Sequence, residues 1–203
     1  GFKLVEYGDA DALEKAITEV RGGASLQFLG QSVAGIGRFD PNMPVSGSTS
    51  NLGDDVAIGA PGTSLAGRLF NGAVYVVRGD VAGLPARYDV TDFGNAPDTA
   101  GLLYVGAASG DSAGSFVGPV GEFIDDPADF DDLIIASPQS DALGKPNRGA
   151  TYIVSGSFEG ADPQGFDLDQ VGQDPSLMAL ALYGQASGEG LRGVYAAPAG
   201  DWN

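Results

Sequence analysis

Short apolar runs, separated by glycine and polar residues, recur along the whole chain. Runs such as 73–77, 133–136 and 150–154 have the length of strands and are too short for typical helices. Tyrosine and valine recur at every second position from Tyr75 and again from Tyr152, as on a pleated surface. This pattern predicts an all-β chain of short strands joined by tight turns.

One stretch of the sequence occurs twice. Residues 54–79 and 131–156 align without a gap and share an aspartate pair, an apolar triplet, a proline and a closing glycine. A shorter motif of glycine, apolar residues, glycine, a polar residue and an aromatic begins at Gly30, Gly114 and Gly193. Repeats of this length are typical of stacked or radial folds.

Each repeat contains four strand-like runs. In the second copy they are 101–106, 115–121, 132–136 and 149–154, and the first run has counterparts that start at Ser25 and Leu180. We therefore expect antiparallel four-stranded sheets within 24–80 and 101–156, arranged as neighbouring blades of a β-propeller.

The remaining segments connect these units. We expect 1–23 to contain the last strand of a preceding blade at 16–21; the alternative is a helix whose capping box is Asp11–Glu14, with Val20 on its apolar face. The other expected segments are a connecting loop at 81–100, a loop at 157–177 and the start of a third blade at 178–203.

The order of glycine, acid, aromatic, aspartate pair, GAP and GAVYVV resembles the FG-GAP repeat of integrin α-subunit propellers and bacterial surface proteins. The GAP tripeptide occurs unchanged at Gly59-Ala60-Pro61, and the equivalent residues of the second copy are Ala136-Ser137-Pro138. The resemblance covers 24–80, 101–156 and the opening half of a third unit. It implies an incomplete propeller of two blades and the start of a third.

The resemblance also implies calcium in the acidic loops between the second and third strands, since calcium takes six to eight oxygen ligands. This chain departs from the family pattern, because Arg38 replaces the leading acid of the first loop and Ile124 replaces a middle ligand of the second. Arg38 could instead form a salt bridge with Asp40 or Asp55. The candidate ligands are Asp40, Asn42 and Asp55 in the first loop, Glu122, Asp125, Asp126, Asp129 and Asp132 in the second, and Asp201 and Asn203 in the third.

Charge and composition narrow the classes of function. The 203-residue chain has a net charge of -17, which disfavours nucleic acid and anionic bilayers as partners. No apolar run is long enough to span a membrane, so we expect no membrane insertion. The chain has no cysteine and no histidine, which excludes disulfides, Ser-His-Asp triads and zinc sites built on these residues.

These observations favour a non-catalytic binding or adhesion module, extracellular or on the cell surface, that calcium stabilises. We expect protein or glycan ligands at the loops 41–52 and 157–176, and further blades from a longer chain or a partner subunit. One alternative is a structural subunit of an appendage, virion or surface layer. The other is an accessory domain of a secreted hydrolase, for which Asp125 and Asp129 are a candidate carboxylate pair.

Overall fold

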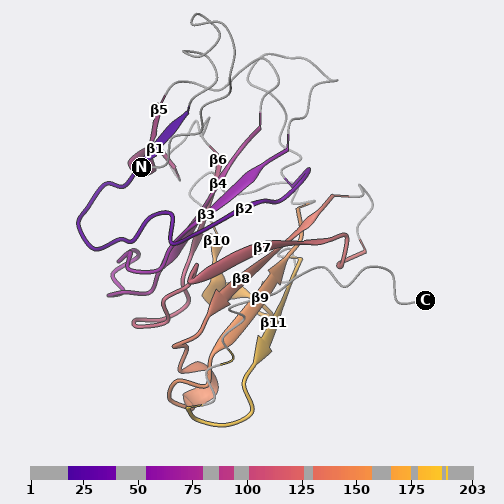
Figure 1. Cartoon of the computed structure of the whole chain (residues 1–203). Coiled ribbons are helices and arrows are strands. Elements are labelled where there is room, and N and C mark those ends of the chain that lie inside the picture. The colour runs from indigo at the N-terminus through magenta and orange to yellow at the C-terminus, as the bar shows by residue number, and fades with distance from the viewer. Residues whose placement is uncertain are drawn as a thin grey trace, which may run out of the picture.

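The described part of the chain is all-β. Within the residues that it describes, the structure, a computed structural model, contains strands and three short 3-10 helices (Figure 1). The predicted fold class is therefore confirmed at this level. The residues that the structure describes are 18–39, 54–79, 87–93, 101–125, 130–156, 166–174, 178–188 and 191.

The first sheet has the strand order β10-β6-β4-β3-β2. Its four main strands pair antiparallel, and β10 (Phe166–Asp167) adds to β6 in parallel. The main strands are β2 (Ser32–Gly35), β3 (Val56–Ala60), β4 (Ala73–Val77) and β6 (Gly101–Val105).

The second sheet is antiparallel throughout, in the order β11-β9-β8-β7. It repeats the register of the first sheet: Ile135 pairs with Tyr152 as Ile58 pairs with Tyr75. Its strands are β7 (Phe116–Gly121), β8 (Asp132–Ser137), β9 (Ala150–Val154) and β11 (Ala179–Tyr183).

A small parallel pair, β1 (Glu19–Arg21) with β5 (Arg87–Asp89), completes the strands. The strand predicted at 16–21 is thus confirmed over β1, whereas the helix alternative is wrong at Val20; residues 16 and 17 lie outside the described part. The short helices are η1 (Val90–Asp92), η2 (Ala142–Gly144) and η3 (Leu168–Gln170).

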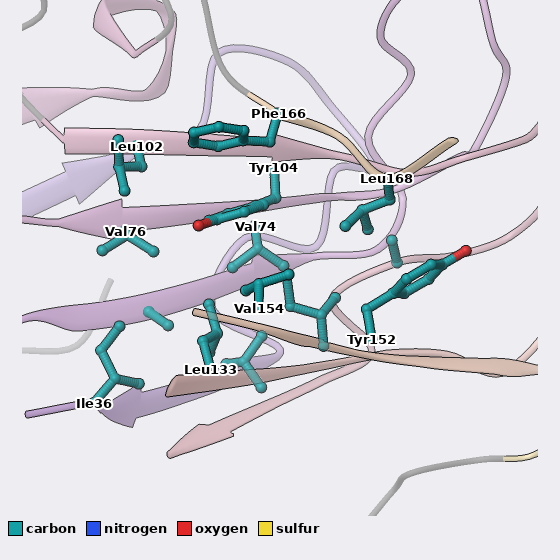
Figure 2. Packing of buried hydrophobic residues seen from close by; sticks show 14 of the residues in the cluster. Ile36, Val74, Val76, Leu102, Tyr104, Leu133, Tyr152, Val154, Phe166 and Leu168 are labelled. Carbon is teal, nitrogen blue, oxygen red and sulfur yellow. The ribbon is translucent and has the colours of Figure 1, made fainter. Parts of the chain in front are cut away.

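The main core lies between the two sheets (Figure 2). Val74, Val76 and Tyr104 of the first sheet meet Leu133 and Val154 of the second. A second apolar cluster covers the opposite face of the first sheet, where Tyr75 packs edge-to-face on Phe93. The strands β3, β4 and β6 are therefore buried on both faces of the first sheet.

The two sheets stack with unlike faces in contact. Tyr75 and Tyr152 hold equivalent places in the repeat, yet Tyr152 points into the core between the sheets and Tyr75 points into the second cluster. The face of the second sheet that bears Tyr152 thus packs on the opposite face of the first sheet. Both tyrosines are packing residues.

The sheets are offset by one strand from the sequence units. The repeat assigns 101–106 to the second unit, but β6 pairs with β4 and lies between β4 and β10 in the first sheet. In the same way β11, expected to open a third blade, pairs with β9 in the second sheet. The fourth antiparallel strand of each sheet therefore comes from the next unit.

The strand expected from Ser25 is wrong. This segment makes turns, and Leu26 and Phe28 adopt positive φ, which a strand does not allow. Residues 22–30 correspond to the loop 106–114 instead: the Gln27 side chain accepts a hydrogen bond from the Ala24 N–H, as the Asp111 side chain does from the Ala108 N–H.

The segment expected as a surface loop at 157–176 is partly buried. Phe166 and Leu168 belong to the main core, and Phe166 stacks on Tyr104 with ring centroids 5.1 Å apart. The connection 81–100 behaves alike: β5 pairs in parallel with β1 as β10 does with β6, and Val90 and Phe93 are buried.

Candidate functional site

The two acidic loops lie at equivalent ends of the two sheets, between β2 and β3 and between β7 and β8. Their closing aspartates, Asp55 and Asp132, sit at the start of β3 and β8 and are buried. A buried carboxylate needs hydrogen-bond donors or a cation to offset the loss of solvation.

Asp55 is satisfied by two backbone donors. Its Oδ2 accepts from the Phe39 N–H at 3.1 Å, and its Oδ1 accepts from the Gly79 N–H at 2.7 Å. Phe39 follows β2 and Gly79 follows β4, so this carboxylate joins the two strands that flank β3.

Asp132 binds the backbone of its own loop. Its Oδ2 accepts from the Phe123 N–H at 2.7 Å and from the Ile124 N–H at 2.5 Å. Ile124, which removes an oxygen from the expected ligand pattern, therefore still contributes to the loop through its N–H.

A third aspartate ties the first loop to the second sheet. Asp131 Oδ2 accepts from the Arg38 N–H at 2.9 Å, and the Asp131 N–H donates to the Arg38 carbonyl at 3.0 Å. The guanidinium of Arg38 lies over the Phe130 ring, 4.8 Å from its centroid. Residues around Arg38 thus form part of the contact between the sheets.

The structure brings together only part of the predicted ligand set. Asp55 and Asp132 bind backbone N–H groups, while Glu122 and Asp125 are exposed. Within the described ranges, no group of three or more acidic residues is placed to hold a metal ion. Asp40, Asn42, Asp126, Asp129, Asp201 and Asn203 lie outside those ranges.

Backbone N–H groups bind both oxygens of the Asp55 carboxylate and Oδ2 of the Asp132 carboxylate. The two carboxylates fit a role as anchors that fix the two ends of each loop. In this arrangement a cation would be bound by the loop's other oxygens.

No motif in the sequence points to Asp111, which is almost completely buried in the loop between β6 and β7. Its Oδ2 accepts from the Ala108 N–H at 3.2 Å. Burial raises the pKa of this carboxyl to about 6, although the hydrogen bonds from Ala108 and the Ser140 hydroxyl lower it. Gln27 at the equivalent position shows that the loop needs an acceptor there rather than a charge.

An ion pair links the β3–β4 loop to β10. Arg68 Nη1 donates to Asp167 Oδ1 at 2.7 Å, to Asp167 Oδ2 at 2.8 Å and to the Gly106 carbonyl at 3.0 Å. The Asp167 hydrogen bond raises the pKa of Arg68. Asn71 also donates to the Gly106 carbonyl, and Arg148 donates to the equivalent Gly184 carbonyl.

Comparison of the chain with models of protein families found no match, and comparison with curated proteins found none either. None of the helices in the described ranges has the length and hydropathy needed to cross a bilayer.

Proposed function

We propose that this chain is a non-catalytic binding module of an extracellular or cell-surface protein, built as a segment of an FG-GAP-type β-propeller. The observation that carries the proposal is the stacking of the two sheets with unlike faces in contact. Such stacking can continue from sheet to sheet in one rotational direction, as in radial repeats.

Two exposed leucines on β11, the edge strand of the second sheet, support the proposal. Leu180 and Leu182 on β11 hold the places that Leu102 and Tyr104 hold on β6. The β6 residues are buried against the second sheet, whereas the β11 residues are exposed. A further sheet that packs there would bury them in the same way.

Binding is assigned to loops that differ in length between the two units, because the strands and the other loops repeat. The connection between β2 and β3 spans 36–55, whereas its counterpart between β7 and β8 spans 122–131. Variable loops on a repeated scaffold are the usual arrangement of recognition surfaces. Protein or glycan ligands are proposed for 41–52 and 157–165.

Calcium is part of the proposal for the second acidic loop. Glu122, Asp125, Asp126, Asp129 and Asp132 bring five carboxylates into one short segment, and a divalent cation would offset their repulsion. Asp132 would anchor this loop while the other side chains supply oxygens.

The test of the binding function is a panel of glycans and extracellular matrix proteins presented to the purified, immobilised chain. Saturable binding is expected, and it should be lost when 41–52 or 157–165 is replaced by a glycine-serine segment of equal length. The melting temperature of each variant shows whether its scaffold is intact. Failure of the wild-type chain to bind any member, or binding that survives both replacements, would contradict the assignment.

A further inference from the structure

One end of the two sheets carries an unusual set of loops. The loops 22–31, 61–72, 106–115 and 138–149 all connect strands at the end opposite to the acidic loops, at the lower left of Figure 1. All four are fully described, and we refer to them together as the apolar end.

Five large apolar side chains are exposed at the apolar end. They are between 51% and 76% exposed, and they are Leu26, Phe28, Leu69, Phe70 and Leu143. Single exposed apolar residues are normal on protein surfaces, whereas several at one end mark an interaction site.

Hydrogen bonds join the neighbouring loops into one surface. The Gly62 N–H donates to the Gln27 carbonyl, between Leu26 and Phe28. The Gly110 N–H donates to the Leu69 carbonyl and the Ser112 N–H donates to the Phe70 carbonyl. The loops of Leu26, Phe28, Leu69 and Phe70 are therefore connected through their backbones. The loop of Leu143 is joined to 106–115 by the hydrogen bond from the Ser140 hydroxyl to Asp111.

The backbone at these side chains is strained. Leu26, Phe28, Phe70 and Leu143 have φ values of 65°, 53°, 51° and 55°, a region that bulky residues seldom adopt. Glycine would adopt it without strain. The presence of leucine and phenylalanine therefore points to a use for the exposed side chains.

The apolar end is nearly uncharged although the chain carries a net charge of -17. Its charged residues are two acids, Asp111 and Asp141, and three bases, Arg68, Lys145 and Arg148. Asp111 and Arg148 are buried, and Arg68 is paired with Asp167. The exposed charges are thus Asp141 and Lys145, one of each sign on the same loop.

This charge pattern is self-complementary. Two copies related by a twofold axis that passes between Asp141 and Lys145 would place Asp141 of one copy near Lys145 of the other. The acidic loops would point away from the contact, which lowers the repulsion between two strongly negative chains, and salt would screen the repulsion that remains.

The area also fits a second copy. At roughly 150–250 Å² for a large side chain, the five residues expose on the order of 600 Å². Each partner of a typical specific interface contributes about 800 Å², so these side chains and the adjoining loop atoms are enough for a weak dimer.

We propose that the apolar end is a self-association surface through which two copies of the chain pack end to end. This inference does not depend on the proposed binding function, because that function is assigned to other loops. Self-association through the apolar end would allow this chain to assemble into a larger structure on the cell surface.

Sedimentation equilibrium of the wild-type chain tests the proposal, together with the double variant Phe70→Asn/Leu143→Asn. Asparagine tolerates positive φ, so these substitutions remove apolar surface without new backbone strain. A second pair, Leu26→Asn/Phe28→Asn, tests the same surface through another loop. Phe123→Asn is the matched control, because Phe123 is equally exposed but follows β7 at the opposite end.

The expected result is a wild-type dimer whose dissociation constant rises at least tenfold in both double variants and stays unchanged in the control. High salt should strengthen the dimer by screening the repulsion between the chains. A wild-type chain that stays monomeric in high salt at several hundred micromolar would overturn the proposal. A dimer that both double variants retain would also overturn it, as would a monomer that binds phosphatidylcholine vesicles through these residues.

Discussion

At the scale of single residues, Gly59 lies where the backbone of the second sheet's loop crosses the first sheet. A Cβ at Gly59 would overlap the carbonyl oxygen of Gly114, a backbone atom that cannot move aside independently. Gly35 in the neighbouring strand has open space around its Cα and no positive φ. The two glycines therefore offer a matched comparison.

Gly59→Ala should lower the free energy of unfolding by about 2–4 kcal/mol, because the two sheets must separate to admit the methyl group. Gly35→Ala should leave it unchanged or raise it by up to about 1 kcal/mol. Urea denaturation of both variants measures the difference. Equal stabilities would show that the close approach of Gly59 and Gly114 does not hold the sheets in place.

The buried carboxyl of Asp111 makes stability depend on pH. Its pKa in the folded chain is about 6, above the 3.8 of an unperturbed aspartate, so the folded chain holds this proton more tightly than the unfolded chain does. The stability contributed by protonation is present below about pH 4 and is lost as the pH rises to about 6. The full effect is on the order of 3 kcal/mol.

Asp111→Asn should remove this dependence, since an amide oxygen can still accept from the Ala108 N–H, as Gln27 does from Ala24. The variant should be more stable than the wild type at pH 7 and should lack the fall between pH 4 and 6. Urea denaturation at several pH values measures both. Asp54→Asn, which alters an exposed acid at the opposite end of the first sheet, should keep the wild-type slope; a shared change would assign the effect elsewhere.

At the scale of elements, two short strands form parallel pairs with strands that precede them in the sequence. β5 follows β4 and pairs with β1, and β10 follows β9 and pairs with β6 of the first sheet. Arg68, in the β3–β4 loop, donates hydrogen bonds to Asp167 of β10 and to the carbonyl of Gly106, which follows β6. Both side chains of this ion pair are largely shielded, whereas those of Arg87 and Glu19, which join β5 to β1, are about half exposed.

Arg68→Gln should destabilise the chain by about 1 kcal/mol, because a charge-assisted hydrogen bond is lost and Asp167 keeps its charge. Arg87→Gln should have no measurable effect, as is usual for exposed ion pairs. Denaturation of the single variants and of Arg68→Gln/Asp167→Asn isolates the interaction. Additive effects in this double variant would mean that the pair contributes nothing of its own.

Most strands could be predicted from the sequence, but their grouping into sheets could not. Alternating side chains identify β4 and β9, because the period of a strand is a local property. β6 pairs with β4 although residues 78–100 separate the two strands in the sequence. The repeat alone suggested a different partner for β6, in the second sheet. Phe166 and Leu168 were missed for a similar reason, since two apolar residues among polar ones show no period that indicates a core.

The candidate site was predictable only in part. The aspartate pairs correctly mark the loop ends at Asp55 and Asp132. Which atoms their carboxylates bind depends on the path of the loop backbone, and no sequence pattern reports that path. The burial of Asp111 could not be predicted, because a single aspartate in a glycine-rich loop is typical of a turn at the surface.

At the scale of the whole molecule, the proposal of calcium predicts a melting temperature that depends on the cation. Calcium at a hundredfold excess over its dissociation constant would stabilise the fold by about 3 kcal/mol. For a chain of this size that corresponds to a shift of roughly 6–12 °C. A chelator should lower the melting temperature, and calcium should restore it better than magnesium.

Asp125→Asn is the informative variant for this response. Asp132 is unsuitable, because its loss would remove backbone hydrogen bonds whether or not calcium binds. Asp125 is exposed in the second acidic loop and should be needed for the response, whereas Arg38→Ala should retain it. A melting temperature that changes with neither chelator nor calcium would refute the calcium site. It would not contradict the stacking of the two sheets.

The offset of one strand between sheets and sequence units has a consequence for how such a chain could be shortened, extended or recombined. A cut between residues 100 and 101, where one sequence unit gives way to the next, would leave the first sheet without β6. Exchange of segments in the glycine-rich loops after the fourth strands, 22–31 and 106–115, would instead transfer a complete four-stranded sheet. The repeat seen in the sequence is therefore not the exchangeable module; that module begins one strand later, and recombination within this chain should respect its boundaries.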